Sequence, residues 1–117
     1  MRMGITIITC SGISNTGKLT TQTGTALLRR HAYAIEAAIP ATRPTAAIKS
    51  ALQHAEEILV LDGCGDCCGH KKLRALGIEP HLHLIATECG IKKNGMSDPG
   101  FAEIERLTAA VLEAVRR

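Results

Sequence analysis

The chain has 117 residues, of which 45% are apolar and 21% charged, so we expect one globular domain over residues 1–117. Its net charge of +3 comes from scattered basic residues, and aromatic residues make up only 2% of the chain. With so few rings to stack bases, nucleic acid is not an expected partner. No run approaches the ~18 to 20 apolar residues that cross a membrane, so no membrane partner is expected either.

The cysteine content indicates the chemistry to look for. Five cysteines are an odd number for a disulfide framework, and the first ten residues lack the length and cleavage pattern of a signal peptide. We therefore expect a cytoplasmic protein whose thiols stay reduced. Metal binding and thiol chemistry are then more plausible uses of the cysteines than structural disulfides. The sequence indicates no oligomeric state.

The first half of the chain predicts two strands and two helices. The β-branched run at residues 5–9 leads into a Cys-Ser-Gly turn, as in a buried strand that runs into a tight loop. A helix capped by Ser14 or Asn15 follows, and a short strand is expected over residues 31–37. Pro44 opens the second helix, because proline suits a first helical turn.

The second half repeats this alternation. Residues 57–63 (EILVLDG) are typical of a strand that is buried on both faces. A helix is expected from about residue 66 to 76, and a fourth strand over residues 81–88 (HLHLIATE). Asp98 and Pro99 predict the start of a final helix. The inner stripe of that helix has spacings of three and four: Phe101, Ile104, Leu107, Val111 and Val115.

Alternating strands and helices predict parallel strands that are joined by right-handed crossovers. We expect a three-layer, Rossmann-like (flavodoxin-like) α/β sandwich with a four-stranded parallel sheet in the order 2-1-3-4. Binding sites in such sheets lie outside the carboxyl ends of the strands. Each cysteine follows one of the expected strands: Cys10 the first, Cys64, Cys67 and Cys68 the third, and Cys89 the fourth. All five are therefore expected at one edge of the sheet.

Two enzyme-like patterns overlap the loop after the first strand. Residues 12–18 (GISNTGK) spell the start of a P-loop, but Leu19 stands where a hydroxyl must bind magnesium. A phosphatase or arsenate-reductase loop with Cys10 as nucleophile would need an arginine where Thr16 stands. Both interpretations are therefore the weaker alternatives.

A third pattern is C-x-x-C, between the third strand and the next helix. Cys64 would be the nucleophile and Cys67 the resolving thiol of a thioredoxin-like redox protein. A third thiol at Cys68 would scramble that disulfide. Thiol–disulfide redox chemistry is the main alternative to metal binding.

A zinc site uses more of the sequence than these patterns do. Thiolates on loops that leave adjacent parallel strands can reach one ion from several directions, as zinc requires. Two helix N-termini and Lys71 or Lys72 would offset the thiolate charge. Four thiolates would also hold an iron–sulfur cluster, and three would leave a position open for a small-molecule ligand. No reaction can be assigned from these residues.

Three motifs together resemble the DGC family, small proteins with an inferred zinc site. They are CSGISNTG at residues 10–17, DGCGDCCGHKKL at residues 62–73, and GIKKN at residues 90–94. The resemblance covers the chain from the first strand to about residue 94. It implies that Cys10, Cys64 and Cys68 are metal ligands, since the last two fit the family's C-x-x-x-C.

The resemblance leaves the fourth ligand open. Members of the family often carry a cysteine at the end of the second strand, where this chain has Ile35, Glu36 or a neighbouring residue. We expect Cys89 to replace it, and Cys67, a water molecule or a substrate are the alternatives. The expected metal ligands are therefore Cys10, Cys64, Cys68 and Cys89.

The remaining polar residues near the cysteines receive lesser roles. Asp62 is expected to accept backbone amide hydrogen bonds, and His70 and Glu88 to face solvent. His81 and His83 begin the fourth strand, ~10 Å or more from its end at ~3.3 Å per residue, so we exclude them from the site. His31 and His54 are excluded from the site as well.

Overall fold

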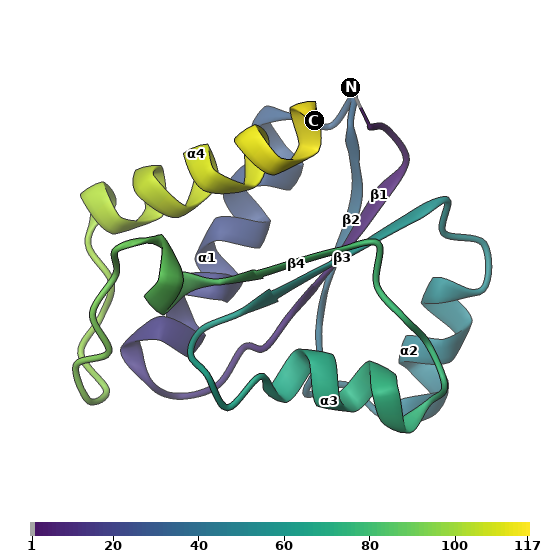
Figure 1. Cartoon of the computed structure of the whole chain (residues 1–117), viewed down its shortest axis with the longest axis horizontal. Helices are drawn as coiled ribbons and strands as arrows, with labels where there is room; N and C mark the ends of the chain where they lie inside the picture. Colours follow the sequence, from purple (N-terminus) through teal and green to yellow (C-terminus); the bar gives the residue numbers. More distant parts are fainter. Residues whose placement is uncertain (1) are drawn as a thin grey trace.

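Residues 2–117, the part of the chain that the computed structural model describes, form four strands that alternate with helices (Figure 1). The strands are β1 (Ile5–Thr9), β2 (Ile35–Pro40), β3 (Glu57–Asp62) and β4 (Leu82–Ile85). All pair in parallel, in the order β2-β1-β3-β4. The predicted α/β class and strand order are confirmed.

The helices form a layer on each side of this sheet. They are α1 (Asn15–Arg30), α2 (Thr45–Leu52), α3 (Cys68–Ala75) and α4 (Phe101–Arg116), and one 3₁₀ turn, η1 (Ala86–Cys89), follows β4. Figure 1 shows α1 and α4 together on one face and α2 and α3 on the other. The molecule therefore has the three layers that the alternation of elements predicts.

The two central strands supply both halves of the core, because successive side chains of a strand point to opposite faces. Ile7 and Leu59 pack with the residues of α1 and α4. Ile8 and Val60, one position further along each strand, pack with α2 and α3. All four side chains are fully buried. This double burial explains why β3 has a continuous apolar run rather than an alternating pattern.

Two strands have boundaries that differ from the prediction: β2 covers residues 35–40 rather than 31–37, and β4 covers residues 82–85 rather than 81–88. β2 begins at Ile35 rather than at residue 31, because the chain first makes a turn in which His31 O accepts the amides of Ala34 and Ile35, both at 2.9 Å. β4 ends at Ile85 rather than at residue 88, because the chain there enters η1. The fourth strand is thus four residues long, half of what its apolar and β-branched composition predicts.

The start of α4 also differs from the prediction. The helix begins at Phe101, and the amide of Gly100 donates to Glu103 Oε1 at 2.9 Å across its first turn. Asp98 lies before the helix and pairs with Lys18. Phe101, expected in the inner stripe, is 72% exposed, because the first turn of α4 extends beyond the sheet.

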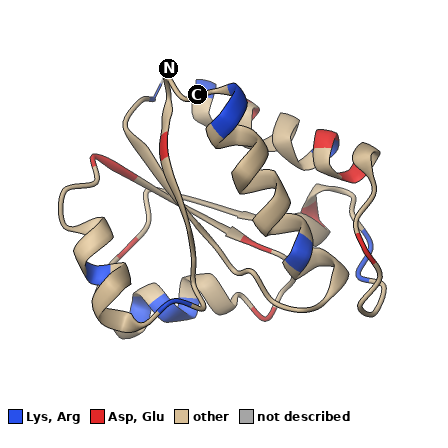
Figure 2. Ribbon diagram, turned by 180° about the vertical axis from the view of Figure 1, so that it is seen from behind, with Lys and Arg blue, Asp and Glu red and all other residues tan. Residues whose placement is uncertain are grey.

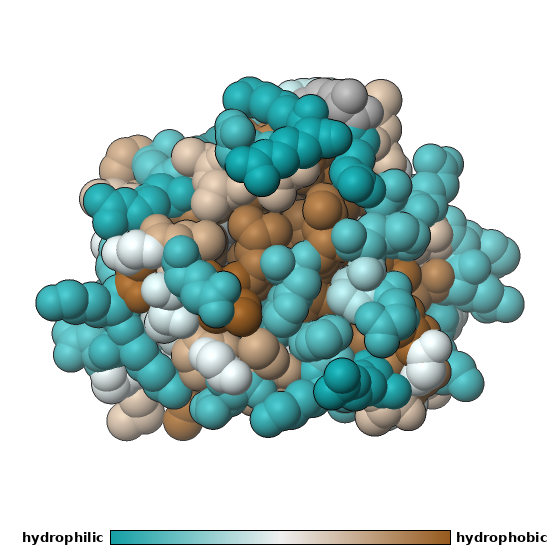
Figure 3. All heavy atoms as spheres, viewed as in Figure 1, coloured by the Kyte–Doolittle hydropathy of each residue, from teal (hydrophilic) through white to brown (hydrophobic). Residues whose placement is uncertain are grey.

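Charged and apolar groups are distributed differently over the surface. Lys and Arg lie on several helices and loops, interspersed with Asp and Glu (Figure 2). Apolar atoms gather in the middle of the face along which β4 runs (Figure 3), and this edge strand is half-buried over its whole length. None of the helices in residues 2–117 is long and apolar enough to cross a membrane.

Candidate metal centre

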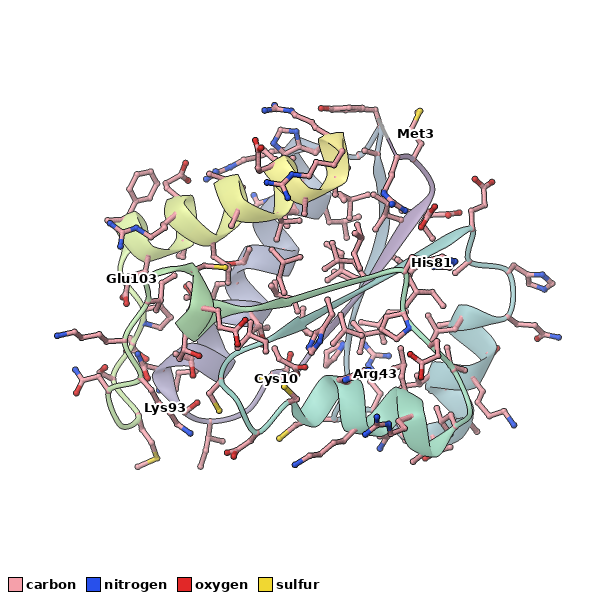
Figure 4. The ribbon with its side chains drawn as sticks, viewed as in Figure 1. Met3, Cys10, Arg43, His81, Lys93 and Glu103 are labelled. Carbon is pink, nitrogen blue, oxygen red and sulfur yellow. The ribbon has the colours of Figure 1, made fainter. Side chains whose placement is uncertain are left out.

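The candidate site lies at the carboxyl edge of the sheet, where β1, β3 and β4 end. The register pairs Asp62 with Ile85, so β3 and β4 end level. Figure 4 shows Cys10 and Lys93 at this end of the molecule and His81 at the opposite end of β4. The loops after these three strands are therefore neighbours.

Asp62 is the buried carboxylate of this site. Its Oδ1 accepts the amide of Gly69 at 2.7 Å, and its Oδ2 accepts the amide of His70 at 3.3 Å. These amides belong to the first turn of α3, whose N-cap residue, Cys67, makes no side-chain cap hydrogen bond. Asp62 thus caps α3 from the end of β3, where the positive end of the helix dipole stabilises its charge. This matches its expected role as an amide acceptor.

His83 lies against the same carboxylate. Its Nε2 is 2.7 Å from Asp62 Oδ2, and its ring packs on that of His70 with centroids 4.6 Å apart. The exclusion of His83 from the site is therefore wrong. β4 is short and pairs His83 with Val60, so His83 lies two residues from the end of the strand rather than near the far edge.

Cys67 completes this group through an uncommon backbone conformation. Its φ of 51° and ψ of 49° lie in the left-handed region, which residues other than glycine rarely adopt. Its amide donates to Cys64 O at 3.1 Å, closing a tight turn before α3. One ligand atom each of Asp62, Cys67 and His83 lies within 4.8 Å of the other two. Within residues 2–117, no other set of three or more such groups is this close.

The three groups have the chemistry of a zinc site. Thiolate, imidazole and carboxylate are all zinc ligands, and tetrahedral ligand atoms about 2.0–2.3 Å from the ion lie about 3.3–3.7 Å apart. The ligand atoms of Asp62, Cys67 and His83 already lie within 4.8 Å of one another, so only small side-chain movements are needed to reach such a geometry. His83 Nε2 and Asp62 Oδ2 lie 2.7 Å apart, a distance at which a proton on one atom is shared with the other, and a bound cation would take the place of that proton.

Glycines allow the loops of the site to pack closely. A Cβ on Gly69 would lie 2.9 Å from Asp62 Oδ1, and one on Gly63 would lie 2.7 Å from the carbonyl carbon of Thr16. A Cβ on Gly17 would meet the backbone of the loop after β1 at 2.6 Å. These contacts bring the loop after β3 against both the first turn of α1 and the carboxylate of Asp62.

The four cysteines predicted as ligands are not gathered into one tight set: within residues 2–117, no three of them have sulfur atoms within 4.8 Å of one another. Cys10, Cys64 and Cys68 follow the paired strands β1 and β3, and the amide of Cys10 donates to Leu61 O at 3.0 Å. Burial raises the pKa of Cys68, with smaller effects from the charges of Cys10 and Asp62. Cys89 lies on η1 and packs against the apolar layer under α4. Burial raises its pKa too, with a smaller effect from Glu88.

The pKa of the Cys67 thiol is raised above its ordinary value. Burial is the largest cause that raises its pKa, followed by the charge of Asp62, while Lys71 acts in the opposite direction. A cation at this position would reverse the effect, because it favours the thiolate. Metal binding at Cys67 is therefore expected to release a proton.

Lys93 lies on the loop after η1 and contacts Cys64. Its Nζ donates to Cys64 Sγ at 3.4 Å and lies 3.9 Å from Asp66 Oδ2. The hydrogen bond to Cys64 raises the pKa of Lys93. Cys64 therefore has a cationic partner that follows η1 in the chain, rather than Lys71 or Lys72 on α3.

Residues of the weaker enzyme-like patterns have other roles here. Lys18, the lysine of the P-loop spelling, donates to Met96 O at 2.7 Å and to Asp98 Oδ1 at 3.1 Å. Leu19 and Thr16, which replace the magnesium ligand and the phosphatase arginine, are both fully buried. Lys18 thus holds a neighbouring loop, while the other two side chains belong to the interior.

Fold and site together define a small parallel α/β protein with thiol, imidazole and carboxylate groups gathered at the carboxyl edge of its sheet. Residues 6–111 match the sequence profile of the DGC domain, so the chain belongs to the DGC domain family. This match spans nearly the whole chain and confirms the resemblance in its motifs. No curated protein and no solved structure matches the chain.

Proposed function

We propose that this DGC-domain protein binds a zinc ion at the carboxyl edge of its sheet, with Asp62, Cys67 and His83 as ligands. The observation that carries the proposal is the mutual approach of their ligand atoms to within 4.8 Å. Asp62 can keep Oδ1 on the amide of Gly69 while Oδ2 turns from His83 to the ion. A mixed set of sulfur, nitrogen and oxygen ligands favours zinc over an iron–sulfur cluster.

The fourth position would be filled from the neighbouring thiols. Cys64 is the first candidate, because its carbonyl and the amide of Cys67 close the same turn. The family resemblance supports a second arrangement, in which Cys10, Cys64 and Cys68 bind zinc with Cys89 as the fourth ligand. The parallel pairing of β1 with β3, which places the loops of Cys10 and Cys64 side by side, is in its favour. Five free thiols also suit a reducing compartment, so we propose the cytoplasm as the location.

Redox chemistry at Cys64 and Cys67 is the second candidate function. The hydrogen bond between the backbones of these residues places both thiols on one turn at the start of α3, as in a C-x-x-C redox site. The raised pKa of Cys67 weighs against the resolving step, in which Cys67 would have to attack the mixed disulfide as a thiolate.

The test is zinc stoichiometry and affinity, measured by competition with a chromophoric chelator under anaerobic conditions. We expect about one zinc per chain, and losses of affinity of at least 10- to 100-fold in Cys67→Ser and His83→Gln. The control is His54→Gln, which changes an exposed histidine outside the site and should bind as the unchanged protein does.

Two other outcomes would lead to a different assignment of the site. Strong loss in Cys10→Ser and Cys64→Ser, with none in Cys67→Ser, would favour the all-thiolate arrangement over the mixed one. Zinc-free protein with a reversible disulfide between Cys64 and Cys67 would overturn the zinc proposal in favour of redox chemistry.

A further inference from the structure

A single buried side chain holds the loop that carries Lys93. Asn15, 3% exposed at the start of α1, donates from Nδ2 to Lys92 O at 2.8 Å. Its Oδ1 accepts the amide of Asn94 at 2.6 Å, and its own amide donates to Gly95 O at 2.9 Å. One side-chain amide thus binds both peptide groups that flank Lys93, much as a neighbouring strand would.

Both ends of this loop are held as well. Ile91, just before it, is 4% exposed and belongs to the core layer under α1 and α4. Beyond it, Lys18 binds Met96 O. The backbone at Lys93 is therefore fixed on either side, even though its side chain is partly exposed.

This support separates Lys93 from an ordinary surface lysine. An exposed lysine gains little from one ion pair, because ordering its long side chain offsets the attraction. Here the backbone of Lys93 is already ordered by Asn15, so only side-chain freedom remains to be lost. The Nζ lies 3.4 Å from Cys64 Sγ, across the gap between the loops that follow β3 and η1.

We propose that Asn15 is a positioning residue that holds Lys93 beside Cys64, where the Lys93 charge offsets that of Asp66, whose Oδ2 lies 3.6 Å from the same sulfur, and so makes Cys64 accessible to anionic ligands and reactants. The inference rests on the proposed function only in placing Cys64 beside the proposed metal site. It does not require that zinc binds.

The test compares two alkylating agents on the reduced, chelator-treated full chain. Iodoacetate is anionic and iodoacetamide neutral; in both reactions sulfur bonds to carbon, iodide leaves and the thiol proton passes to solvent. The ratio of their rates at Cys64, measured by peptide mass spectrometry, does not depend on the fraction of thiolate. A change in this ratio between two variants therefore reports a change in the charge near Cys64.

Replacing Lys93 by a neutral residue should change that ratio. We expect Lys93→Gln to lower the iodoacetate-to-iodoacetamide ratio about three- to five-fold at low salt, the effect of one charge about 4 Å away in water. High salt should reduce the difference. Lys93→Arg should keep the ratio, and the matched control Lys92→Gln, which removes an equal charge from the adjacent exposed residue, should leave it unchanged.

The role of Asn15 is tested through its coupling to Lys93. Asn15→Ala should lower the ratio, and should lower it no further in a Lys93→Gln background. In the unchanged protein, the Asn94 amide should be protected from hydrogen exchange by its bond to Asn15 Oδ1.

Four results would overturn the inference: an unchanged ratio in Lys93→Gln, an unchanged ratio in Asn15→Ala, an unprotected Asn94 amide, or a further fall in the double variant. Zinc titration of the same preparations tests the proposed function separately, so either can fail while the other holds.

Discussion

Gly69 is the residue on which the contact between Asp62 and α3 depends. Its missing Cβ would lie 2.9 Å from Asp62 Oδ1 and 3.2 Å from Val60 Cγ1. We expect Gly69→Ala to lower the free energy of unfolding by about 1–3 kcal/mol, because the extra methyl group must displace the buried carboxylate. This outweighs the gain of up to about 1 kcal/mol in helix propensity. Urea unfolding of the metal-free protein measures the change.

The matched control is Gly65→Ala, four residues earlier in the same segment. No atom lies within 4 Å of the Cβ that this change would add, and Gly65 is exposed. Its stability should stay within about 0.5 kcal/mol of the unchanged protein. Equal losses of stability in the two variants would mean that the contact with Asp62 does not exclude a larger side chain at position 69.

Residue rules predict some members of the site and miss others. Asp62 could be predicted as an amide acceptor, because aspartate after a buried strand usually has that role. The left-handed backbone of Cys67 could not, since local preferences favour glycine there. His83 was missed because its place depends on where β4 ends, which no single residue fixes.

Element-scale patterns predict the sheet well but not every boundary. The periodicities of the apolar residues give four strands, four helices and their order. The end of β4 could not be predicted, because residues 86–88 are as compatible with a strand as with the 3₁₀ turn they form. The start of α4 depends on Gly100 and Glu103 rather than on the expected Asp98 and Pro99. Packing and loop contacts, rather than local propensity, decide such ends.

The inner face of α4 provides a prediction for one element. Leu107 is fully buried against the sheet, whereas Phe101, in the first turn of the same helix, is 72% exposed. We expect Leu107→Ala to lower the free energy of unfolding by about 2–5 kcal/mol, through lost apolar burial and the cavity left behind. Thermal and urea unfolding measure this change.

Phe101→Ala is the control within the same helix. It removes a larger side chain, yet stability should change by no more than about 0.5 kcal/mol, because that side chain is mostly in water. A loss in Phe101→Ala as large as in Leu107→Ala would contradict the placement of the first turn beyond the sheet.

At the scale of the whole molecule, the shifted thiols make stability depend on pH. Burial raises the pKa values of Cys67, Cys68 and Cys89 in the folded state. In the unfolded chain these thiols ionise at their ordinary, lower pKa. Above that pKa the unfolded chain therefore binds fewer protons than the folded one, and alkali favours unfolding. The stabilising contribution is complete below the unfolded pKa and is lost as the pH rises through the folded pKa.

We therefore expect the free energy of unfolding of reduced, metal-free protein to fall as the pH rises from about 8 to about 10. Cys89→Ser should lower stability throughout but flatten this slope, because the hydroxyl that replaces the thiol does not ionise in the range. Zinc should reverse the trend at Cys67, since a bound cation stabilises the thiolate. Urea unfolding across the range, with and without zinc, measures both slopes. A metal-free protein whose stability rises with pH over this range would contradict the raised pKa values of these thiols.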